Sequence, residues 1–76
     1  MTKEELTKDY EENRDRLVKS RNETTQYREQ LEKENEEDYC EIRYEIIIQW
    51  ENSEVIAEQK ITINRLQYLL AIEKLK

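Results

Sequence analysis

Apolar side chains are divided unequally between the two halves of this 76-residue chain. The second half holds most of them, and the first half holds only Met1, Leu6, Tyr10, Leu17, Val18, Tyr27 and Leu31. A chain of this length forms one domain, residues 1–76, near the lower size limit for a stable monomer. We therefore expect the second half to supply the core and the first half to lack a core of its own.

The first half has the sequence of a long charged helix over residues 3–38. Thr2 and Glu5 form a capping box at its start, acid-before-base pairs recur four residues apart, and no glycine or proline interrupts it. A second capping-box pattern begins at Ser20, so a break near residues 20–25 is the alternative. In that case the two arms can fold back on each other.

Residues 39–63 show the period-two pattern of an amphipathic β-hairpin. Apolar and polar side chains alternate from Cys40 to Trp50, and the alternation resumes after Asn52 and Ser53, which favour a two-residue turn. Residues 64–76 then carry the apolar stripe of a C-terminal helix that begins at Asn64. The predicted fold class is α+β, in the order helix, strand, strand, helix.

A lone two-stranded hairpin is marginally stable and leaves both edges unpaired. Ile47 and Ile56 would also lie on the face turned away from the C-terminal helix. We therefore expect a homodimer in which two hairpins join into one sheet. The alternative is a monomer whose N-terminal helix folds across its own hairpin and covers these two isoleucines.

The composition indicates a protein that is not an enzyme. It has no histidine for acid–base catalysis or metal binding, and no glycine for a phosphate loop or an EF-hand. The single cysteine, Cys40, excludes an intramolecular disulfide and fits a reducing compartment. No apolar run is long enough to cross a membrane. We expect no catalytic residue, no cofactor, no metal, no small-molecule substrate and a cytoplasmic location.

The net charge of −6 is distributed in blocks. Residues 3–12 carry −3, residues 14–21 carry +3 and residues 29–41 carry −6. This balance disfavours direct binding to nucleic acid or to an anionic membrane and favours a basic protein partner. A dense row of carboxylates on a helix approaches the charge density of duplex DNA. The expected partner-binding residues are Glu29, Glu32, Glu34, Glu36, Glu37, Asp38 and Glu41, with Glu4, Glu5, Asp9, Glu11 and Glu12 as a second row.

A short, acidic chain without glycine or proline, in which residues 29–41 lead into the predicted hairpin, resembles the small host-takeover proteins of bacteriophages. Among these it is similar to DNA mimics that inhibit the bacterial nucleoid protein HU. The resemblance implies a dimer whose acidic surface occupies the DNA-binding surface of HU and blocks its DNA binding.

Two other functions fit the same sequence. The first is a coiled-coil structural or adaptor protein, which would pair with a partner helix through a seam of Leu6, Tyr10, Leu17, Tyr27 and Leu31. The second is a regulator, such as an antitoxin, that covers a basic active site. Loss of binding at high salt separates the mimic from the adaptor, because apolar burial is not screened by salt.

Overall fold

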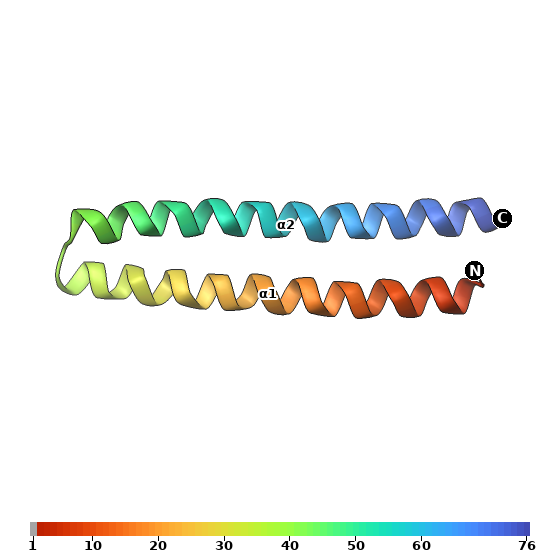
Figure 1. Ribbon diagram of the computed structural model, residues 1–76, viewed down its shortest axis with the longest axis horizontal. Helices are drawn as coiled ribbons and strands as arrows, with labels where there is room; N and C mark the ends of the chain where they lie inside the picture. The colour runs from red at the N-terminus through yellow and green to blue at the C-terminus, as the bar shows by residue number, and fades with distance from the viewer. Residues whose placement is uncertain (1) are drawn as a thin grey trace.

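The computed structural model describes residues 2–76, which form a hairpin of two long helices (Figure 1). Helix α1 spans Lys3–Glu37 and helix α2 spans Glu41–Leu75. The two helices lie antiparallel, so the chain ends meet at one end of a rod that measures 56 × 15 × 12 Å. Residues 38–40 make the short connection at the other end.

Helix α1 begins where the capping pattern places it. The Thr2 hydroxyl accepts a hydrogen bond from the Glu5 amide at 3.2 Å, which satisfies one of the free amides of the first turn. The alternative of a break near residues 20–25 is not observed, and one helix continues through this region. Thr24 is accommodated because its hydroxyl donates to the Ser20 carbonyl at 3.1 Å. The arms of α1 therefore do not fold back on each other.

The predicted β-hairpin over residues 39–63 is wrong. These residues lie almost entirely within α2, no strand occurs in residues 2–76, and the fold is all-α rather than α+β. Asn52 and Ser53 form no turn. The Ser53 hydroxyl instead donates to the Gln49 carbonyl at 3.1 Å, one helical turn earlier. Asn64 is likewise an interior residue of α2 and not the cap of a separate helix.

Helical spacing explains why α2 forms in place of the hairpin. Every seventh residue from Ile47 and from Trp50 faces α1 and is at least half-buried; the two series are Ile47, Glu54, Ile61 and Tyr68, and Trp50, Ala57, Asn64 and Ala71. This is a heptad seam, and it runs without interruption across the expected turn. Isoleucine lowers helix propensity by only a few tenths of a kcal/mol per residue, which packing against α1 readily outweighs.

Aromatic contacts fix the register between the helices. The rings of Tyr10 and Tyr68 stack with centroids 4.4 Å apart, and Tyr27 lies across Trp50 at 4.8 Å. The hydroxyls of Thr7 and Tyr68 lie 3.0 Å apart, within hydrogen-bond distance. The same antiparallel register sets the middle of α1 opposite the middle of α2. The core is therefore a single line of contacts along the rod.

The interface of α1 follows the predicted seam only in part. Tyr10, Leu17 and Leu31 are half-buried against α2, whereas Tyr27 remains 45% exposed. Arg21 and Arg28, seven residues apart, are half-buried, and Arg28 takes the place in the seam that the prediction gave to Tyr27. Ile47, 5% exposed, is the only buried apolar residue of the part that the structure describes. The core is thin because much of the seam on α1 is polar.

Candidate interaction surface

The connection between the helices is organised by two side chains. The Asn35 side-chain oxygen accepts from the Cys40 amide at 2.8 Å, which closes the turn ahead of α2. Arg43 donates to the carbonyls of Glu34 at 3.1 Å and Asp38 at 2.6 Å. A cation at the end of α1 is favourable because free carbonyls there carry partial negative charge. The last turn of α1 has no basic residue, so α2 supplies it.

This closed turn forms the acidic tip, defined as residues 29–41. The tip carries −6, and the segments before and after it are each neutral overall, so the whole net charge gathers at one end of the rod. Most of the expected partner-binding carboxylates here are exposed. The exception is Glu32, which accepts from Arg28 at 2.7 Å and is half-buried. Figure 1 shows the tip at the end opposite the chain termini.

The second expected acidic row lies elsewhere. Glu4, Glu5, Asp9, Glu11 and Glu12 are exposed in the first turns of α1, near the chain termini. The rod is 56 Å long, and the two rows occupy its opposite ends. They do not form one continuous surface. The basic block over residues 14–21 lies between them.

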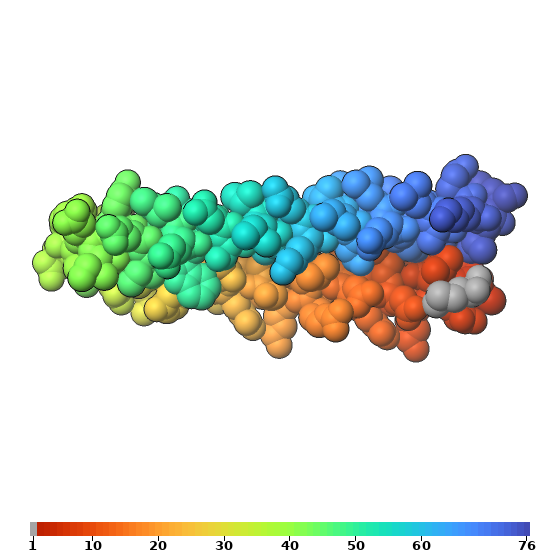
Figure 2. Space-filling model, turned by 45° about the horizontal axis from the view of Figure 1, so that its top comes forward, coloured from red at the N-terminus to blue at the C-terminus, as the bar shows by residue number. Residues whose placement is uncertain are grey.

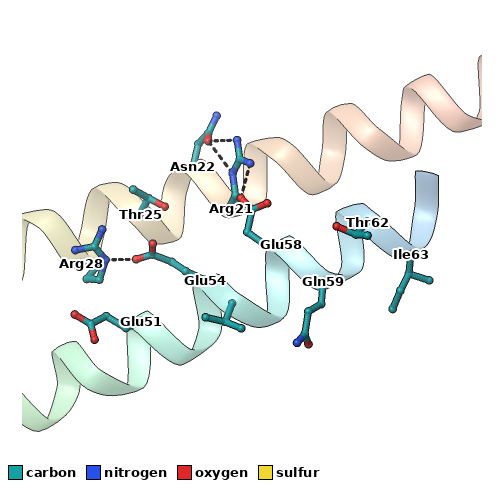
Figure 3. Close-up of a pocket in the computed structure, with 11 residues that line it drawn as sticks. Arg21, Asn22, Thr25, Arg28, Glu51, Glu54, Glu58, Gln59, Thr62 and Ile63 are labelled. Carbon is teal, nitrogen blue, oxygen red and sulfur yellow. Dashed lines mark hydrogen bonds and ion pairs between the residues drawn. The ribbon is translucent and has the colours of Figure 1, made fainter. Parts of the chain in front are cut away.

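Ion pairs cross between the helices at the middle of the rod. Arg28 donates to Glu54, and Arg21 donates to Glu58 at 2.6 Å (Figure 3). The Arg28 side chain is 18% exposed and that of Glu54 is 21% exposed. The hydrogen bonds that Arg28 donates, first to Glu54 and then to Glu32, raise the pKa of Arg28. These pairs line an open groove of about 920 Å³ on one side of the rod, which also includes Val55 and Ile63.

Large exposed apolar side chains gather on α2, and those of its central and C-terminal turns lie on the side turned away from α1. We define the outer face of α2 as its six large aliphatic residues of the central and C-terminal turns: Val55, Ile56, Ile63, Leu66, Leu69 and Leu70. Each is between 50 and 62% exposed. Figure 2, in which α2 comes forward, shows side chains of this helix covering the upper part of the rod along its length.

Apolar residues therefore lie on all sides of α2. A helix of this kind is normally buried on all sides, whereas α1 covers only one side here. Sequence reasoning missed the outer face because Val55, Ile56 and Ile63 were assigned to a strand. It also missed the pair of Arg28 and Glu54. The signal was the seven-residue spacing that joins residues 47–71 into one helix.

No group of side chains suited to holding a metal ion occurs in residues 2–76. Neither described helix combines the length and apolar character that a membrane span needs. The chain matches no protein-family model, no curated protein and no solved structure. The surface of the molecule therefore has to carry the functional argument.

Proposed function

We propose that this protein is a non-catalytic assembly protein whose outer face of α2 binds an amphipathic helix. A cytoplasmic location is part of the proposal. The observation that carries it is the outer face itself, with six aliphatic side chains at least half-exposed on one side of one helix. Contiguous apolar surface of this kind is typical of protein interaction sites. An amphipathic helix is the natural partner because it packs against another helix through residues three and four apart.

Helix binding also supplies what the hairpin lacks. With one buried apolar residue among residues 2–76, the hairpin has a smaller core than a chain of this length usually builds. A helix laid along α2 buries the outer face and converts a single line of contacts into a core between three helices. The partner therefore contributes to stability as well as to recognition.

A designed amphipathic peptide with leucines at alternating three- and four-residue spacing tests this proposal. We expect it to bind fluorescently labelled protein equally well at about 0.1 M and about 1 M NaCl, because apolar burial is insensitive to ionic screening. The variant Leu66→Glu should lose binding. The variant Glu36→Lys/Glu37→Lys, which changes only the acidic tip, should retain it. Binding that disappears at high salt, or that Leu66→Glu leaves intact, would refute the proposal.

A second candidate function rests on the acidic tip. The gathering of all net charge at one end of the rod favours a basic partner, and the tip could stand in for DNA phosphates on a DNA-binding protein such as HU. Within this proposal the binding residues are the exposed carboxylates of residues 29–41. The row over residues 3–12 would bind separately, because it lies at the other end.

Displacement of DNA tests the second candidate. The protein is added to a complex of HU with labelled duplex DNA, and release is followed by fluorescence anisotropy. Release that weakens with salt and with Glu36→Lys/Glu37→Lys supports DNA mimicry. The Leu66→Glu variant is the matched control and should release DNA as the natural chain does. No release at large excess removes HU as the target.

A further inference from the structure

The hairpin exposes more surface than a folded protein of its mass. Its accessible surface is 6121 Å², whereas a compact chain of 9.4 kDa exposes about 5,000 Å². The excess, roughly 1,100 Å², is comparable with the ~800 Å² that each partner buries in a specific complex. The area left over therefore matches one protein interface of ordinary size.

We propose that a second copy of this chain occupies the outer face of α2, with the two α2 helices packed antiparallel about a two-fold axis between Thr62 and Ile63. The inference rests on the proposed function, in which this face binds a helix. It identifies that helix as α2 of the second copy. Each α2 is then covered by α1 on one side and by the second α2 on the other. The assembly contains four helices in the order α1, α2, α2, α1.

The spacing of the outer face is symmetric about this axis. Val55 and Ile56 lie seven residues before Thr62 and Ile63, and Leu69 and Leu70 lie seven residues after them. Seven residues are two helical turns, so all of these positions share one face. An antiparallel two-fold arrangement about this axis sets Val55 against Leu70 and Ile56 against Leu69 of the second copy, and Thr62 against Ile63. Symmetric interfaces need this self-complementary pattern.

The polar residues beside the face fit the same axis. Glu58 lies before the centre and Arg65 after it, so in the second copy Arg65 comes within two residues of the position opposite Glu58, about 3 Å along the helix. Arg65 makes no ion pair within residues 2–76, and Glu58 accepts from Arg21 through Oε1 alone. The second oxygen of Glu58 can accept from Arg65 of the second copy. The dimer therefore gains two such pairs, one on each side of the axis.

Charge also selects the antiparallel orientation. The segment that overlaps in this register, residues 49–76, contains four acidic and four basic residues and is neutral overall. The two acidic tips project from opposite ends of the dimer, roughly 65 Å apart at ~1.5 Å per residue. A parallel arrangement would place the two tips, each of charge −6, side by side. Repulsion between them disfavours that alternative.

Sedimentation equilibrium of the full chain tests the second copy. We expect twice the 9.4 kDa chain mass at micromolar concentration, with little change at high salt. The variant Leu66→Glu should sediment as a monomer. The matched control is Ile42→Glu, because Ile42 is 69% exposed on the same helix but lies outside the overlap. The inference is overturned if the natural chain sediments as a monomer, or if Leu66→Glu and Ile42→Glu dissociate the dimer to the same extent.

Disulfide trapping tests the orientation without disturbing the face. In a Cys40→Ser background, Thr62→Cys should cross-link to its own counterpart in the second copy, whereas Asn52→Cys alone should not. Mixing Asn52→Cys with Glu73→Cys should restore a cross-link, because these positions lie at equal distances from the axis. Efficient cross-linking of Asn52→Cys alone would show a parallel dimer and overturn the antiparallel arrangement.

The designed peptide separates failure of this inference from failure of the proposed function. A natural chain that stays monomeric but binds the peptide through Leu66 retains the helix-binding function and loses the second copy. A monomeric chain that also fails to bind the peptide loses both.

Discussion

Two neighbouring isoleucines allow a direct test of which face of α2 packs against α1. Ile47 is 5% exposed against α1, and Ile48, the next residue, is 40% exposed. Replacing either with alanine removes the same three carbon atoms, worth about 2.4 kcal/mol if all are fully buried. The cavity left at Ile47 adds a further cost, and the better helix propensity of alanine offsets about 0.4 kcal/mol at both sites. We expect a loss of about 2.5–3 kcal/mol for Ile47→Ala and about 1 kcal/mol for Ile48→Ala.

The difference should be visible in thermal unfolding followed by circular dichroism at equal protein concentration. A loss of 2.5–3 kcal/mol lowers the Tm by roughly 10–24 °C in a chain of this size, and a loss of 1 kcal/mol by about 4–8 °C. Equal shifts for the two variants would mean that α2 does not present Ile47 to α1. A larger shift for Ile48→Ala would reverse the assignment of its faces.

Three further substitutions probe the polar parts of the seam. The Asn64 side-chain nitrogen is buried without a hydrogen-bond partner, so Asn64→Leu should raise the Tm by about 4–8 °C in thermal unfolding, and a lower Tm would contradict this. Arg28→Met should lower the free energy of unfolding in urea by about 2 kcal/mol, because it leaves Glu54 unpaired in the seam. The double variant Arg28→Met/Glu54→Leu should regain at least about 1 kcal/mol of this loss. Additive losses would show that the two side chains do not interact. Asn35→Ala should lower the free energy of unfolding by about 1 kcal/mol, because the hydrogen bond from the Cys40 amide is lost. An unchanged free energy of unfolding would show that this hydrogen bond does not stabilise the turn.

The N-terminal half could be predicted because its signals are local. The hydroxyl of Thr2 caps α1, and the helix continues to the turn without glycine or proline, much as the sequence indicates. Capping and charge pairing act within one or two turns, so they can be identified without knowledge of the fold. The position of the acidic residues at the end of α1 follows from the same signals.

The second half was mispredicted because two periodicities coexist there. Alternation from Cys40 to Trp50 favours a strand, yet the run of Ile46, Ile47 and Ile48 also surrounds a helix with apolar side chains. The choice between them depends on α1, which covers one side of α2 and leaves the other exposed. Asn52 and Ser53 resemble a turn but lack the glycine that usually accompanies one. The complete absence of glycine and proline was the stronger signal.

The antiparallel hairpin has a consequence for the order in which its contacts form. Asn35 bonds to Cys40 only five residues away, whereas Thr7 and Tyr68 are separated by 61 residues. Closing a short loop loses little chain entropy, so we expect contacts between the helices to form first near the turn. The stacked pair of Tyr10 and Tyr68, at the other end of the rod, should form last. Folding therefore starts at the acidic tip, the segment whose like charges repel one another most. The guanidinium of Arg43, placed on the carbonyls of Glu34 and Asp38, partly neutralises that repulsion where folding begins.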